Sequence, residues 1–124
     1  MSFSIQVLGL ESAKVFLKTK GKEALALANA AVMKAGFYVQ GEVQQSIAGQ
    51  RAEPRSVDTG RFLNSVRVVQ NTPLSATIES NVEYAKFLEY GTSRMPARSH
   101  FRNSSKRNEK KVREFIVIEL KKIE

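Results

Sequence analysis

The feature that most constrains the fold is a long stretch of helical periodicity in the first half of the chain. Apolar residues recur there at steps of three and four, which places them on one face of a helix: Leu25, Ala28, Val32, Ala35, Val39, Val43 and Ile47. The helical period begins near Glu11, and Gly21 is expected to divide a short first helix from a long one that ends near Ile47. Gly36 and Gly41 lie on or beside the apolar face, where a missing side chain lets another element approach closely.

Alternating residues on both sides of this helix predict β-strands. Residues 3–7 alternate between apolar and polar side chains, which is typical of a half-buried strand. Residues 66–68 and 76–78 alternate in the same way around the sequence NTPLS. They predict an antiparallel hairpin with Asn71 and Pro73 in its turn.

Two further helices are predicted after the hairpin. In the segment VEYAKFLEYGT, Tyr84 and Leu88 lie one helical turn apart, and Gly91 stands where a C-terminal cap belongs. The last helix is predicted to run from about residue 105 to residue 123, with Ser104 or Ser105 as its N-cap. Its apolar stripe consists of Val112, Phe115, Ile116, Leu120 and Ile123.

Between these elements lies a segment without periodicity. Residues 48–57 include Gly49 and Pro54 and form a loop that is long for a compact domain, so we expect it to be functional or mobile. After it, Asp58 or Thr59 is expected to cap one short helical turn. The fold class that follows is α+β in a single domain of residues 1–124, with an N-terminal strand, a long helix, an antiparallel hairpin sheet, a short helix and a C-terminal helix.

Composition argues against most catalytic classes. The chain has no cysteine, which removes disulfides, thiolate zinc sites and a cysteine nucleophile. Its one histidine, His100, lies among cations and is interpreted as a packing or surface residue rather than a ligand or base. No glycine-rich phosphate loop is present, and we predict no cofactor and no bound metal. The sequence also shows no apolar stretch long enough to cross a bilayer and no signal peptide, so we expect synthesis in the cytoplasm and no membrane partner.

The carboxylates keep one enzymatic alternative open. Asp58 with Glu79, Glu83 or Glu89 would be the ligands of a metal-dependent nuclease. No Asp-x-Asp or Glu-x-Lys spacing fixes such a geometry, and ion pairs with the many arginines are the simpler interpretation.

Positive charge is concentrated near the end of the chain, whose net charge is +8. The segment 94–113 sets eight basic side chains against Glu109 alone: Arg94, Arg98, Arg102, Lys106, Arg107, Lys110, Lys111 and Arg113. Such a segment attracts an acidic protein surface or a polyanion. Phe101 is its only aromatic residue, which argues against direct base readout. A solvated face, a docking surface, a lumen facing DNA and a small basic nucleic-acid-binding protein remain the interpretations.

Two motifs in residues 58–101 are more specific. DTGRFLNSV, a hairpin and then YAKFLEYGTSRMPARSHF follow one another in an order that resembles the tail-completion (head–tail joining) proteins of long-tailed bacteriophages. The chain departs from that pattern at Ser99 and His100, where an aromatic residue or a Pro-Phe pair is usual. The residues that carry the resemblance are Asp58, Thr59, Gly60, Tyr84, Ala85, Glu89, Tyr90, Gly91, Thr92 and Pro96.

This resemblance implies a non-enzymatic virion protein that forms a ring, expected to be a hexamer, at the phage neck. Its partners would be further copies, the head-closure protein and a tail-terminator or tail-tube protein, with DNA passing through the ring without sequence readout. A head-to-tail ring needs two different patches on each subunit. We expect one on the loop 48–57 with the YAKFLEYGT helix, and the other on PARSHFRN with the start of the last helix. The interface candidates are Arg94, Arg98, Phe101, Arg102, Lys106 and Arg107.

Within the motifs, folding roles are expected first. Gly60 and Gly91 are predicted to adopt backbone conformations that a Cβ atom would strain. The side chains of Tyr84, Leu88 and Tyr90 are predicted to pack the short helix on the sheet. For Glu89, either an ion pair with Arg61 or Arg98 or a solvated position is expected.

Overall fold

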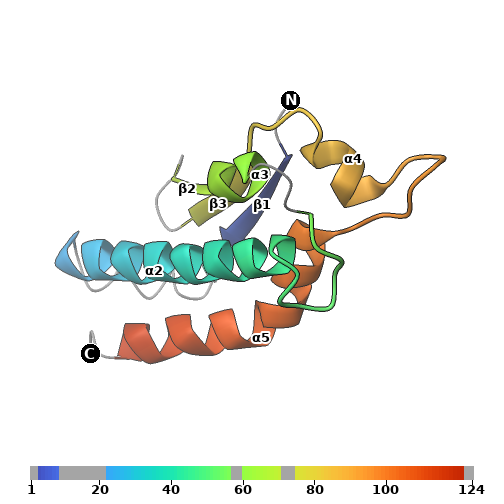
Figure 1. Ribbon diagram of the computed structural model, residues 1–124. Coiled ribbons are helices and arrows are strands. Elements are labelled where there is room, and N and C mark those ends of the chain that lie inside the picture. Colours follow the sequence, from blue (N-terminus) through green and yellow to red (C-terminus); the bar gives the residue numbers. More distant parts are fainter. Residues whose placement is uncertain (1–2, 9–21, 57–59, 71–74, 122–124) are drawn as a thin grey trace.

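The computed structural model describes residues 3–8, 22–56, 60–70 and 75–121. The helix α2 (Lys22–Ile47) packs on one side against a small sheet and on the other side against α5 (His100–Lys121), which runs beside it in the opposite direction (Figure 1). Three shorter elements, α3 (Arg61–Ser65), α4 (Ala85–Tyr90) and the segment 91–99, lie at the end where α2 finishes and α5 begins. The predicted α+β fold is confirmed.

The periodic face of α2 forms the centre of the core. Its predicted apolar residues that the structure describes are all buried: Ala28, Val32, Ala35, Val39, Val43 and Ile47. All of these except Ala28 form one cluster with Phe62 of α3, Ile78 of the sheet, and Phe101 and Ile116 of α5. The helix expected before Gly21 and the side chain of Leu25 lie outside the described residues.

The sheet has three antiparallel strands in the order β1-β3-β2. β1 (Phe3–Leu8) and β2 (Arg67–Val69) flank β3 (Ser75–Ser80), so that Ile78 pairs with Ile5 on one side and with Val68 on the other. The predicted hairpin is confirmed, although its turn at residues 71–74 lies outside the description. Ile78 is fully buried because α2 covers this face of the sheet.

One glycine of α2 is required by the contact with the sheet. A Cβ atom added at Gly36 would lie 3.1 Å from the Cβ of Ala76 and 3.1 Å from a methyl group of Val68. The expected close approach is therefore confirmed at Gly36. At Gly41 an added Cβ would meet nothing within 4 Å, so the same expectation is wrong there.

Two helix starts differ from the sequence prediction. The N-cap position of α3 is occupied by Gly60, at φ 81°, rather than by Asp58 or Thr59, which lie outside the described residues. α5 begins at His100, five residues before the predicted start near Ser105. The reason is a cap supplied from another part of the chain, by Glu89, as shown below.

Two other predictions on local structure hold. Gly91 ends α4 at φ 77°, as predicted for a C-terminal cap. Residues 48–56 of the expected loop are free of helix and strand. Within the described residues, no helix has the length and apolar character needed to cross a membrane.

The two glycines of α2 give a matched test of the helix–sheet contact. Gly36→Val should destabilise the fold by about 1–3 kcal/mol, because its methyl groups would overlap the strands. Gly41→Ala should instead stabilise it by up to about 1 kcal/mol, because alanine is the better helix former and the space is open. Urea unfolding of both variants measures the two effects. Equal effects of the same sign would contradict the close approach at Gly36.

Candidate functional site

A buried carboxylate holds the start of α5. Glu89, in α4, is 1% exposed, and its two oxygens accept the backbone N–H groups of Phe101 and Arg102 at 2.9 and 3.0 Å. The guanidinium Nε of Arg102 donates to the same carboxylate at 3.0 Å. The first N–H groups of a helix have no partner within the helix, and its positive end favours an anion. Glu89 therefore caps α5 from outside, and its ion-pair partner is Arg102 rather than the predicted Arg61 or Arg98.

The segment between the two helices folds back on α4. An added Cβ at Gly91 would lie 2.7 Å from the backbone nitrogen of Ala97, so only glycine fits this turn. Thr92 and Met95 exchange backbone hydrogen bonds at 2.8 and 3.3 Å, and the N–H of Arg98 donates to the carbonyl of Leu88 at 2.6 Å. These contacts place the carboxylate of Glu89 where α5 begins.

The other motif residues divide between core and surface. Ala85 is buried, and Tyr84 packs edge-on against Phe62 with ring centroids 5.8 Å apart. Tyr90 is 53% exposed, and the guanidinium carbon of Arg102 lies 4.5 Å from the centroid of the Tyr90 ring. The predicted packing of Tyr90 on the sheet is therefore wrong. Pro96 is exposed.

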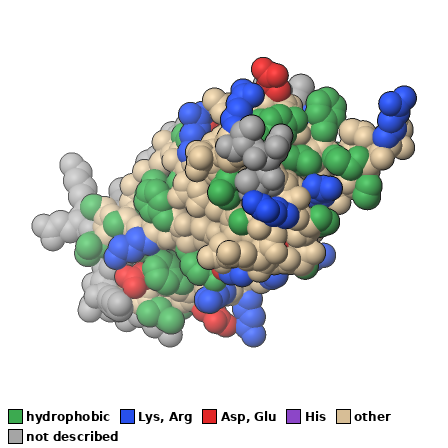
Figure 2. Space-filling view, in the orientation of Figure 1, with side chains coloured by type: hydrophobic (Ala, Val, Ile, Leu, Met, Phe, Trp, Pro, Cys, Tyr) green, Lys and Arg blue, Asp and Glu red, His purple; other side chains and the backbone are tan. Residues whose placement is uncertain are grey.

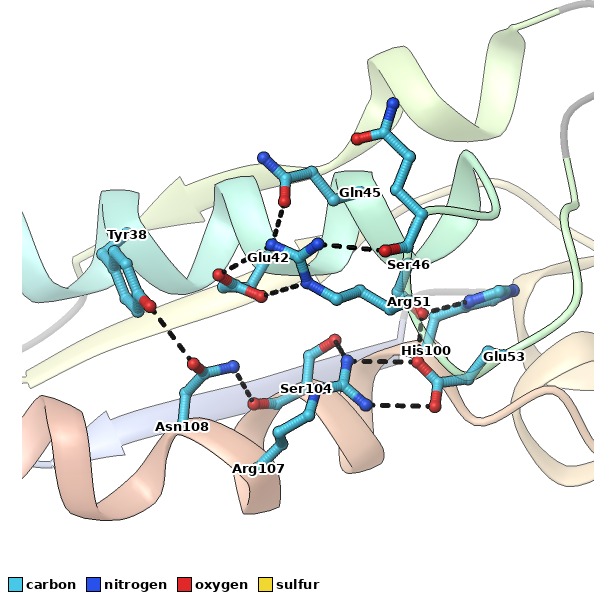
Figure 3. A network of polar contacts seen from close by, with 11 residues as sticks. Tyr38, Glu42, Gln45, Ser46, Arg51, Glu53, His100, Ser104, Arg107 and Asn108 are labelled. Atoms are coloured by element: carbon cyan, nitrogen blue, oxygen red, sulfur yellow. Dashed lines mark hydrogen bonds and ion pairs between the residues drawn. The ribbon is translucent and has the colours of Figure 1, made fainter.

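A second buried carboxylate ties the loop of residues 48–56 to both long helices. Glu53 accepts two hydrogen bonds from the guanidinium of Arg107, both at 3.1 Å, and one from the hydroxyl of Ser46 at 2.5 Å (Figure 3). A further one comes from the side-chain amide of Asn103 at 3.2 Å. Burial by itself raises the pKa of Glu53, but these hydrogen bonds outweigh it and lower the pKa to about 2. The loop is therefore anchored, and the alternative of a mobile loop is not supported.

His100 lies within this network and is fully buried. Because the hydroxyl of Ser46 donates to Glu53, its oxygen must accept from Nδ1–H of His100, 2.8 Å away. Nε2 then accepts from the hydroxyl of Ser56 at 2.7 Å. Burial lowers the pKa of His100 to about 4; Glu53 opposes the shift and Arg98 adds to it. The imidazole is neutral at neutral pH, as expected of a packing histidine.

The residue types in this chain of hydrogen bonds are those of a hydrolytic triad, but the arrangement differs. The hydroxyl of Ser46 stands between the imidazole of His100 and the carboxylate of Glu53. An imidazole with a pKa near 4 is also a weak base at neutral pH. We therefore assign the network to folding.

The carboxylates proposed for a nuclease site do not converge. Glu79 pairs with Arg67 at 2.6 Å, Glu89 is buried against Arg102, and Glu83 is exposed. The fourth candidate, Asp58, lies outside the described residues. Among the residues that the structure does describe, no group of three potential metal-ligating side chains is found.

Most of the predicted interface residues are used within the chain. Arg102 and Arg107 pair with the two buried carboxylates, and Arg98 donates to the backbone carbonyl of Arg55 at 3.0 Å. Phe101 is fully buried in the core, so its assignment to an interface is wrong for this fold. Arg94 and Lys106 are the exposed candidates whose side chains form no hydrogen bond or ion pair among the described residues; Arg102 and Arg107 are exposed too but paired.

Large exposed apolar side chains lie on two parts of the described chain, and Figure 2 shows hydrophobic side chains in several patches over the face in view. The first group is on and just before α4, where Tyr84, Phe87 and Tyr90 are 37, 54 and 53% exposed. The second is on α2 and α5 and consists of Leu27, Phe37, Tyr38 and Ile118, which are 59, 54, 36 and 56% exposed. Between these two helices lies an open pocket of about 110 Å³, lined by Lys34, Ala35, Tyr38, Lys111, Val112 and Phe115.

The buried histidine predicts an acid-sensitive fold. Between pH 6.5 and 4 the unfolded chain binds a proton at His100 that the folded chain does not, so stability is present above pH 6.5 and falls as the pH drops. The loss should reach about 3 kcal/mol near pH 4. NMR titration of the one histidine, alongside urea unfolding at each pH, measures both quantities. A His100 pKa near 6.5 in the folded chain would contradict the buried network.

The cap on α5 predicts a large difference between two nearby carboxylates. Glu89→Ala should cost at least about 2 kcal/mol, because two backbone N–H groups lose their acceptor and one of them is buried. Glu83→Ala, which removes an exposed carboxylate, should change stability by less than about 0.5 kcal/mol. Thermal or urea unfolding compares them. A small change in both variants would show that the cap does not hold α5.

The comparisons with known proteins bear on the origin of this fold. Residues 13–91, more than half of the chain, match the family model described as "Bacteriophage HK97-gp10, putative tail-component". Neither the curated proteins nor the solved structures give a significant match. The family match agrees with the predicted resemblance to phage tail-completion proteins and points to a structural rather than an enzymatic role. The chain belongs to the HK97-gp10-like family of bacteriophage tail components.

Proposed function

We propose that this chain is a tail-completion protein that forms a ring at the phage neck and joins the DNA-filled head to the tail. Its partners in this proposal are further copies of itself, in a ring expected to be a hexamer, the head-closure protein, and a tail-terminator or tail-tube protein. DNA passes through the ring without being read. The family supports the coarser part of the proposal, a structural part of the virion.

The observation that carries the ring is the pair of unlike apolar surfaces. One surface, Tyr84, Phe87 and Tyr90, lies on and just before α4, and the other lies along α2 and α5. A two-fold dimer joins the same patch of both subunits, whereas a closed ring joins two different patches. Exposed aromatic side chains are also the residues that contribute most at protein interfaces. Two different exposed apolar surfaces on one small chain therefore favour head-to-tail assembly.

The remaining positive surface supports contacts to neighbouring proteins more than nucleic-acid readout. Phe101, the one aromatic residue inside the basic segment, is buried and offers no platform to a base. Arg94 and Lys106 are exposed and form no hydrogen bond or ion pair through their side chains among the described residues. These two cations are therefore suited to an acidic surface on an adjacent ring.

Joining is tested in the phage that encodes the chain. When the gene for this chain is deleted, filled heads and complete separate tails should accumulate in electron micrographs. The wild-type chain supplied in trans should restore joined particles. Joined, infectious particles in its absence, or a complete lack of tails, would contradict a role in joining.

A charge-reversal variant tests the exposed cations in the same assay. Arg94→Glu with Lys106→Glu should leave the fold within about 0.5 kcal/mol per site of wild type but reduce joining. Arg107→Glu is the matched contrast and should unfold the chain, because it places a carboxylate beside the buried Glu53. Normal infectivity of the double variant would remove these cations from the joint, and loss of DNA binding with normal joining would favour the nucleic-acid alternative.

A further inference from the structure

We propose that neighbouring copies of this chain are joined by Phe87 of one copy, which enters the pocket between α2 and α5 of the next copy, while Glu83 pairs with Lys34 and Lys111 at the edge of that pocket. The proposal rests on the ring proposed above and specifies its contact. It assigns the two surfaces to each other rather than to different proteins.

The pocket suits one aromatic ring. Its volume is about 110 Å³, and its apolar wall is formed by Ala35, Val112 and Phe115. An apolar protein cavity of about 150 Å³ holds a whole benzene molecule, so this smaller but open pocket has room for the outer part of a phenylalanine ring. Tyr38 forms a further wall and is held by the ammonium group of Lys111, which lies 5.1 Å from its ring centroid.

Phe87 has the form of the group that would fill this pocket. It is 54% exposed although it belongs to a helix whose other side packs on the core through Ala85 and Leu88. The free energy of a large apolar side chain left in water falls when it is buried in an apolar pocket. Glu83 lies four residues earlier in the chain, in the turn that leads into α4.

Charge complementarity favours a contact between the segment that carries Glu83 and Phe87 and the lysines at the edge of the pocket. Lys34 and Lys111 are exposed and lie at the pocket, so an incoming apolar group should carry a carboxylate beside it. Glu83 is exposed and forms no hydrogen bond or ion pair among the described residues, unlike Glu79 and Glu109, which pair with arginines. It is thus an exposed carboxylate, available to a partner and four residues from Phe87 in the chain.

The positions of the two surfaces allow the contact to repeat. α4 lies beyond the end of α2, whereas the pocket lies along the α2–α5 pair (Figure 1). A copy that receives a Phe87 side chain in its pocket therefore still presents its own Phe87 to a third copy. Such a contact leaves one unfilled pocket and one free Phe87 at the ends of any open chain, and only a closed ring fills all of them.

Cross-linking in assembled particles tests the contact. The chain has no cysteine, so Glu83→Cys combined with Lys111→Cys introduces the only two thiols. A short bismaleimide should join copies in joined particles into a ladder that extends beyond dimers, because each copy then carries one thiol of each kind. Each single variant should give no product larger than a dimer. Glu83→Cys with Arg113→Cys is the matched control: Arg113 is also an exposed basic residue of α5 but does not line the pocket, and this pair should give no ladder.

The outcomes separate this contact from the neck function. Joined particles that yield only monomers, a ladder from the Arg113 control alone, or cross-links from position 111 to a different virion protein would overturn the contact while leaving the joining role intact. If the cysteine variants do not enter particles, a second experiment that exchanges the charges of the two surfaces tests the contact. Glu83→Lys should reduce joined particles by about tenfold or more through like-charge repulsion, and adding Lys34→Glu and Lys111→Glu should restore them. Failure of this exchange to restore joining would also overturn the contact.

Discussion

The structure depends on a negative charge that has been removed from water and placed at the start of a helix. Glu89 is nearly inaccessible, and its carboxylate is stable there because two backbone N–H groups and a guanidinium surround it. The turn at Gly91 directs the chain back along α4, so that α5 begins beside the Glu89 carboxylate. Once the start of α5 is fixed, Phe101 enters the core and Arg107 reaches Glu53, so the loop of residues 48–56 is held as well.

The same arrangement changes the meaning of the basic segment. Arg102 and Arg107 lie on one helix but turn to different carboxylates, one in α4 and one in the loop after α2. Part of the positive charge that resembles a docking surface in the sequence is therefore paired with carboxylates of the same chain. A count of cations measures the long-range field of the chain, whereas the contacts decide which of them a partner can reach.

Local signals were sufficient for much of the fold. The period of α2, the alternation in β2 and β3, and the glycine that ends α4 are each readable from neighbouring residues, and each is confirmed. The start of α5 was missed because its cap is Glu89, in another helix, rather than a serine beside it. The network of Ser46, Glu53 and His100 gives no signal in the sequence, since His100 lies far along the chain from the other two and each residue is unremarkable alone. Phe101 was misassigned because its basic neighbours masked a buried position.

The order of the strands has a consequence for how the chain folds. β2 and β3 are close in sequence, whereas β1 pairs with β3 across most of the chain, from Phe3 to Ser80. Closing so long a loop costs more entropy than forming a hairpin, so the hairpin should form early and β1 should be added late. Until then one edge of β3 has unpaired hydrogen-bonding groups that any extended chain can match. The chain is thus exposed, for a short time during synthesis, to exchanging its first strand with another copy of itself.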